Sequence, residues 1–101
     1  MRVIVFFDLP VKTKMDRRQY TLFRNFLLDQ GFIMIQKSVY SKIVLNKSGA
    51  ETVIRNIESN KPKEGNVQLL TISERQYENI RFIVGESQKE VIDSRDRLVF
   101  L

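Results

Sequence analysis

One carboxylate, Asp8, directly follows the apolar residues 3–7 near the start of the chain. At the end of a central strand such a carboxylate suits a divalent cation, but position alone favours a turn residue that accepts backbone hydrogen bonds. Mg²⁺ needs a full octahedral set of oxygens, and the next acidic residues, Asp16 and Asp29, fall on the predicted helix, so one copy of the chain offers only a sparse site. The sequence holds no His and no Cys, which excludes zinc centres and Ser/His or Cys/His catalysis. Water activated by a bound cation is then the most accessible route to hydrolysis.

Basic residues form a second candidate site, for a polyanion. The net charge of +5 is uneven: residues 1–50 hold 9 Lys or Arg and 3 Asp, whereas residues 51–101 hold 8 Lys or Arg and 9 acidic residues. Basic side chains at the start of a helix oppose its dipole, which indicates an anionic ligand such as phosphate, although a solvated face is the alternative. No base-reading motif is present, so contacts to the nucleic-acid backbone are expected. The candidate residues are Lys12, Lys14, Arg17, Arg18, Arg24, Lys37 and Lys42.

The order of the predicted elements places these residues in a single α+β domain, residues 1–101. Apolar runs predict strands, and apolar residues at three- and four-residue steps predict helices that begin at capping boxes, Thr13 with Asp16 and Ser48 with Glu51. The predicted strands are residues 2–8, 32–36, 38–45, 67–73 and 80–84, and the predicted helices are residues 13–30 and 48–60. The β-α-β-β-α-β order is typical of the ferredoxin-like fold, with an antiparallel sheet and both helices on one face.

The uncovered face of such a sheet predicts a homodimer packed through the sheets. If Asp8 lies near the two-fold axis, the second copy supplies a second carboxylate, and one ion bridges the two chains. Residues 86–101 are expected to form a flexible segment followed by an extra C-terminal strand. Its apolar residues are expected to bind a sheet edge of this chain or of a partner. They are Leu98, Val99, Phe100 and Leu101.

The N-terminal apolar run is too short for a signal peptide, and no stretch approaches the roughly 18 apolar residues of a membrane span. A cytoplasmic protein with no membrane partner is therefore expected. Three tyrosines, Tyr20, Tyr40 and Tyr77, are weaker candidates for stacking on single-stranded bases, the alternative being an ordinary structural role.

Three stretches, RVIVFFDLP, the basic KMDRRQYTLFRNFL and GFIMIQKSVYSKIVL, together resemble the CRISPR-associated protein 2 family, the small core subunit of the CRISPR adaptation complex. The resemblance covers nearly the whole chain and is nearest to the version found with type II systems. It implies a homodimer that binds duplex DNA and bridges dimers of the CRISPR integrase during spacer acquisition. It also implies a Mg²⁺-dependent endonuclease on RNA or DNA, with Asp8 as the catalytic metal ligand.

Within this resemblance, Arg17 and Arg18 fall where the family carries arginines, and Ser38 and Val39 match its S-V-[YF] segment. Many members have a polar or acidic residue shortly after the aspartate, whereas Leu9-Pro10 follows here, which removes one potential ligand. The alternative function is a ferredoxin-like regulatory or ligand-sensing dimer with no nuclease role. The uneven charge disfavours that alternative.

Overall fold

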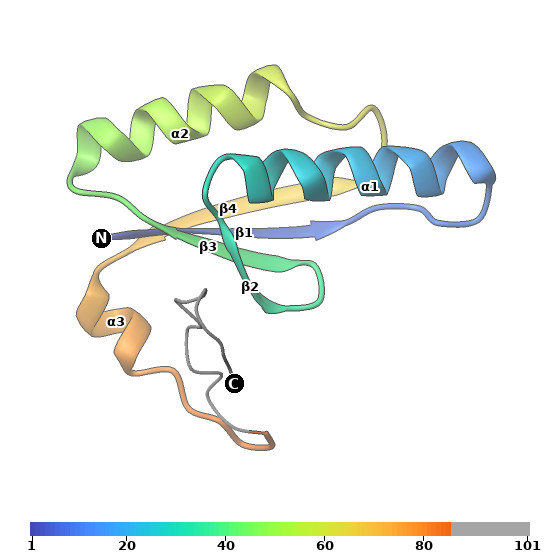
Figure 1. The fold of residues 1–101 in the computed structure, drawn as a ribbon. Coiled ribbons are helices and arrows are strands. Elements are labelled where there is room, and N and C mark those ends of the chain that lie inside the picture. Colours follow the sequence, from blue (N-terminus) through green and yellow to red (C-terminus); the bar gives the residue numbers. More distant parts are fainter. Residues whose placement is uncertain (86–101) are drawn as a thin grey trace, which may run out of the picture.

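A four-stranded antiparallel sheet carries two helices on one face in the computed structural model, which describes residues 1–85 (Figure 1). The strands lie in the order β2-β3-β1-β4, so β1 is an interior strand. The elements are β1 (Arg2–Asp8), α1 (Lys14–Asp29), β2 (Ile33–Gln36), β3 (Val39–Ile43), α2 (Lys47–Ser59), β4 (Asn66–Ile72) and α3 (Glu74–Glu78). The predicted α+β, ferredoxin-like arrangement is confirmed, while the predicted C-terminal strand and residues 98–101 lie outside the described residues.

Strand β1 has two different faces because successive side chains of a strand point to opposite sides of the sheet. Val3, Val5 and Phe7 point toward the helices and belong to the buried core. The intervening residues, Asp8 among them, point to the face of the sheet away from α1 and α2, which we call the open face. Phe6 lies on this open face and is partly exposed, so it is not a core residue of the single chain.

Helix α1 begins and ends where its local sequence predicts. The Thr13 hydroxyl accepts a hydrogen bond from the Asp16 N–H, and the Asp16 carboxylate accepts one from the Thr13 N–H, which together form the predicted capping box. Gly31 follows the helix at φ +94°, and its N–H donates to the Leu28 carbonyl oxygen. These caps fix the basic start of α1 just after the carboxyl end of β1.

Helix α2 begins earlier than predicted, and the capping box of Ser48 with Glu51 is wrong. The N-cap is Asn46, whose side-chain oxygen accepts a hydrogen bond from the Gly49 N–H at 2.9 Å. Asn caps as well as Ser does, so two nearby candidates compete and the sequence pattern does not decide between them.

The predicted strand at residues 80–84 is also wrong. Helix α3 follows β4 instead, starting at a capping box in which Ser73 and Gln76 satisfy each other's backbone N–H groups. Ile83 and Val84 are then 88% and 91% exposed. A strand exists only where a ladder partner is present, and residues 80–84 have no such partner within residues 1–85.

Arg2 attaches α3 to the open face near the start of β1. Its Nε lies 3.1 and 3.0 Å from the two carboxylate oxygens of Glu74, and one terminal nitrogen donates to the Ser41 hydroxyl at 3.3 Å. The guanidinium also lies 3.7 Å above the centre of the Tyr77 ring. Arg2 is buried, so its charge is satisfied by an ion pair, a hydrogen bond and a cation–π contact.

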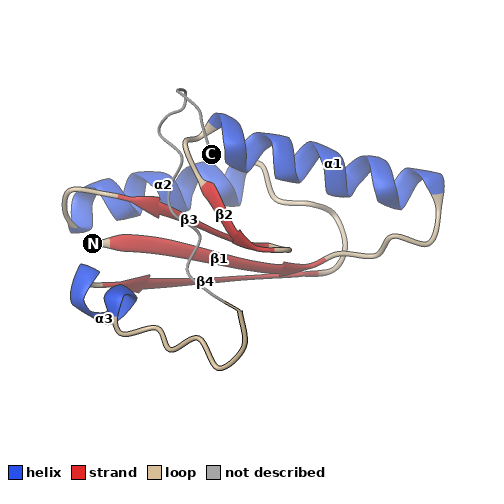
Figure 2. Cartoon of the chain, turned by 60° about the horizontal axis from the view of Figure 1, so that its bottom comes forward, coloured by secondary structure: helices blue, strands red, loops and turns tan. Residues whose placement is uncertain are grey.

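The open face is turned toward the viewer in Figure 2, with α1 and α2 behind the sheet. The pairing of β1 with β3 and β4 places apolar residues of all three strands there, because directly opposed residues point to the same face. The exposed ones, together with one residue of β2, are Phe6, Ile33, Ile43 and Leu70. None of the helices within residues 1–85 is long and apolar enough to cross a membrane.

Candidate functional site at the carboxyl end of β1

Asp8 is the last residue of β1 and its side chain is exposed on the open face. No hydrogen bond or ion pair engages its carboxylate within residues 1–85. The turn-residue interpretation, in which Asp8 accepts backbone hydrogen bonds, is therefore not supported by the described contacts. An exposed and unengaged carboxylate at the end of an interior strand is instead available to a ligand.

Two neighbouring turns hold the backbone around Asp8. On the β3 side, the Phe7 N–H donates to the carbonyl oxygen of Ser38 at 3.0 Å. Ser38 is in the left-handed region at φ +66°, which is uncommon outside glycine, and its hydroxyl lies 3.3 Å from that of Tyr20. Ser38, the first residue of the S-V-[YF] segment noted in the sequence, therefore supports the end of β1.

On the β4 side, Gly65 packs directly against the peptide that follows Asp8. A Cβ atom at Gly65 would lie 2.7 Å from the Asp8 carbonyl oxygen and 2.8 Å from Leu9 Cδ2. Gly65 also has φ +94°, a conformation that other residues adopt at a cost. The close approach thus requires glycine, and it fixes the distance between the α2–β4 loop and the carboxyl end of β1.

We expect Gly65→Ala to lower the free energy of unfolding by about 1–3 kcal/mol and to displace Asp8, because the new Cβ must push backbone atoms apart. Gly85→Ala is the matched control, since Gly85 has φ +91° but no atom of the described residues lies within 4 Å of the place its Cβ would take. Chemical denaturation of both variants measures the difference. Equal losses in the two variants would show that only backbone strain, and not the contact with Asp8, matters.

The donor chemistry at Asp8 fits a hard divalent cation in part. Within residues 1–85 no group of three or more Asp, Glu, His or Cys side chains could hold a metal ion. Asp8 therefore supplies one carboxylate, and the remaining oxygens must come from water, from substrate phosphates, from neutral side chains or from a second copy of the chain. A shared site between two copies is compatible with the exposure of Asp8 on the open face.

Four of the seven predicted basic residues lie together, and the other three are spread over the fold. Lys12, Lys14, Arg17 and Arg18 lie in the β1–α1 loop and the first turns of α1, close in sequence to Asp8. The Arg17 guanidinium donates to the carbonyl oxygens of Val11 and Lys12 at 3.2 and 3.1 Å. Arg17 therefore shapes this loop, while Arg18 is exposed and has no ion pair within residues 1–85.

The other three predicted basic residues lie apart from that group and from one another. Lys37 is exposed in the β2–β3 turn. Ser38, the residue after it, accepts a hydrogen bond from the backbone of β1. Lys42 lies on β3, and its Nζ is beside Gly31 at the C-terminal end of α1. A positive charge there interacts favourably with the helix dipole. Arg24 is exposed in the middle of α1. The structure therefore separates Lys42 from the surroundings of Asp8.

Each of the three tyrosines is buried or packs against other residues of the chain. Tyr40 is 1% exposed, so the prediction that it stacks on bases is wrong for this conformation. Tyr20 packs against the core, with its ring centre 5.6 Å from that of Phe7, and Tyr77 lies under the Arg2 guanidinium. Burial and these contacts explain the tyrosines without a nucleic-acid partner.

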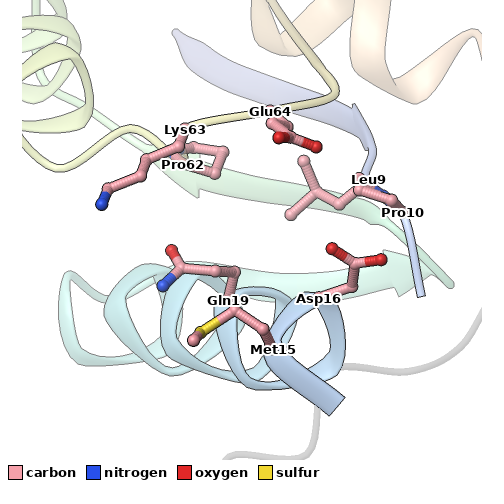
Figure 3. A pocket seen from close by; sticks show the side chains of 8 residues that line it. All are labelled: Leu9, Pro10, Met15, Asp16, Gln19, Pro62, Lys63 and Glu64. Atoms are coloured by element: carbon pink, nitrogen blue, oxygen red, sulfur yellow. The ribbon is translucent and has the colours of Figure 1, made fainter. Parts of the chain in front are cut away.

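A cavity of about 180 Å³ lies next to the strand end, between the start of α1 and the α2–β4 loop (Figure 3). Its apolar lining includes Leu9, Pro10, Met15 and Pro62, and Figure 3 shows Asp16 and Glu64 on opposite sides of it. Small-molecule sites usually enclose about 300–1,000 Å³. The cavity is below that range, so it gives little support to a ligand-sensing function.

Sequence reasoning missed the residues that the α2–β4 loop brings to Asp8. Gly65 contacts the backbone of Asp8, and Asn66 is its direct partner across the β1–β4 pair. A glycine between two polar residues is a local turn signal, but its partner strand cannot be read from the local pattern. The β1–β4 register identifies Asn66, and the close approach of the backbones identifies Gly65; both depend on the whole fold.

The molecule is thus a ferredoxin-like α+β domain with one unengaged carboxylate at the end of an interior strand and basic residues on the adjoining helix start. The pattern of the family described as CRISPR associated protein Cas2 matches residues 1–80, and the chain belongs to this family. It is 52% identical to a CRISPR-associated endoribonuclease Cas2 from Treponema denticola over the full length of both proteins. Proteins with the same name from Streptococcus mutans and Ligilactobacillus salivarius are 46% and 45% identical over all of this chain and 93% and 100% of theirs.

Proposed function

We propose that this chain is a CRISPR-associated endoribonuclease that works as a homodimer with Mg²⁺ at Asp8. The observation that carries the proposal is the exposed Asp8 carboxylate on the open face, with no partner among residues 1–85. The names of the curated relatives supply the substrate class, since they are called endoribonucleases. A bound divalent cation supplies activation of water and neutralises phosphate charge.

The chain's own residues account for the other requirements of such an enzyme. Arg18 and Lys14 are exposed at the start of α1 and supply positive charge for a phosphodiester backbone. Arg17 holds the loop between Asp8 and α1 through two carbonyl oxygens. Gly65 and Ser38 fix the strand end from either side. The test is cleavage of a labelled RNA by the purified chain, with and without Mg²⁺, in the wild type and in Asp8→Asn.

The homodimer is part of the proposal because one chain supplies only half of the carboxylates. The exposed apolar side chains of Phe6, Ile43 and Leu70 lie on the same open face as Asp8. Burying these side chains against a second copy removes apolar surface from water, which favours association. Packing through this face also places the two Asp8 residues on one shared interface.

The second candidate function is that of a CRISPR adaptation subunit, in which the dimer binds duplex DNA and bridges integrase dimers during spacer acquisition. The exposed basic residues at the start of α1 favour it, because backbone contacts without base readout suit a protein that holds DNA of any sequence. This role and the nuclease role are compatible, since the basic surface and Asp8 are different groups.

We expect Arg18→Glu to weaken binding to duplex DNA and to reduce its salt dependence, because one phosphate contact is replaced by repulsion. Arg75→Glu, on α3 across the sheet from α1 and α2, is the charge-matched control and should change the affinity less (Figure 1). Fluorescence anisotropy with a labelled duplex over a range of salt concentrations measures both. Equal losses in the two variants would mean that net charge, and not the start of α1, determines binding.

A further inference from the structure

Asn66 lies beside Asp8 because β1 and β4 are antiparallel and these two residues are direct partners in the register. Residues directly opposite each other point to the same face of a sheet, with Cβ atoms about 4.5–5.5 Å apart. The side chains of Asn66 and Asp8 are therefore neighbours on the open face. Figure 2 shows the end of β1 lying alongside the start of β4.

Nothing within residues 1–85 explains this asparagine structurally. Asn46 caps α2 through its side-chain oxygen, and the side-chain amides of Asn56 and Asn60 donate hydrogen bonds. The side chain of Asn66 is exposed and makes no hydrogen bond to the described residues.

We propose that the side-chain oxygen of Asn66 is a second ligand, from the same chain, for the divalent cation held by Asp8. The inference rests on the metal-dependent function proposed above. Hard cations take amide oxygens as well as carboxylates, and in protein kinases an asparagine helps to hold Mg²⁺. An amide oxygen adds a ligand without adding negative charge, so the site remains able to accept a phosphate group.

The contact at Gly65 is consistent with this role. Gly65 immediately precedes Asn66 and packs on the carbonyl oxygen of Asp8, so the start of β4 is held against the end of β1. The two side chains are thereby set on neighbouring backbone segments rather than on separate loops. In a dimer that shares the site, each chain contributes two oxygen-bearing side chains, and water and substrate phosphate complete the ligand set.

The test is the binding of Mn²⁺ to the whole chain. Binding is measured as the decrease in the electron paramagnetic resonance signal of free Mn²⁺. We expect Asn66→Leu, which keeps the size but removes the oxygen, to weaken binding by about tenfold or more. Asn66→Asp, which keeps an oxygen ligand, should retain or tighten binding. Thr71→Val is the control, since it removes a polar group from the same strand on the helix side of the sheet.

A spectroscopic measurement separates direct ligation from a purely structural effect. In protein with ¹³C-labelled asparagine side chains, bound Mn²⁺ should show a short-range ¹³C coupling that disappears in Asn66→Leu. Mn²⁺ binding that requires Asp8 but is unchanged in Asn66→Leu would overturn the role of Asn66 and leave the proposed function standing. If the wild type binds no Mn²⁺, or if Asp8→Asn leaves binding intact, both the metal site at Asp8 and the role of Asn66 are wrong.

Discussion

Replacement of Asp8 by Asn should abolish Mg²⁺-dependent cleavage of RNA by the purified protein. The substitution keeps the size of the side chain but removes the negative charge that, in the proposed function, holds the cation at the end of β1. Stabilisation by a catalytic cation is worth several kcal/mol, so a fall of at least about 100-fold in the cleavage rate is expected. Cleavage of an end-labelled RNA under single-turnover conditions measures this rate.

The structure predicts that this loss is not caused by unfolding. Asp8 is exposed and its carboxylate is unengaged within residues 1–85, so the free energy of unfolding should change by less than about 0.5 kcal/mol. Asp29→Asn, the same change at the far end of α1, is the matched control and should cleave at the wild-type rate. Undiminished cleavage by Asp8→Asn would mean that another site or a contaminating nuclease is responsible.

The elements around Asp8 are predictable because their signals are local. The apolar run before Asp8 identifies β1, and the capping box of Thr13 with Asp16 identifies the start of α1. Helix α3 was not predicted, although Ser73 followed by Gln76 is a signal of the same local kind. The predicted strand at residues 80–84 is wrong because a strand also needs a non-local partner. An apolar run does not reveal whether such a ladder partner exists.

The site itself is only half predictable. Asp8 is a candidate from the sequence alone, since it directly follows an apolar run in a chain without His or Cys. Its neighbours Asn66 and Gly65 become visible only through the antiparallel register of β1 and β4, which joins distant parts of the chain. Arg17 was predicted from its charge, but the side chain also holds two carbonyl oxygens of its own loop, which charge alone does not reveal.

Leu70→Asp should convert the proposed homodimer into a monomer. Leu70 is 51% exposed on β4, opposite Ile4 on the open face, where a second copy would bury it. A carboxylate at this position would have to lose its hydration at the interface without a partner, which costs several kcal/mol in each copy. Light scattering coupled to gel filtration should show a wild-type mass about twice the chain mass of 11.9 kDa, and a variant mass equal to it.

Loss of the dimer in Leu70→Asp should also change the cleavage of RNA. If the cation is shared by the Asp8 residues of two copies, the monomeric variant loses cleavage as well, although Asp8 itself is intact. Leu22→Asp is the matched control, because Leu22 is 52% exposed on α1, away from the open face, and should leave both mass and cleavage unchanged. A Leu70→Asp monomer that cleaves RNA at the wild-type rate would contradict the shared site and would confine the metal to one chain.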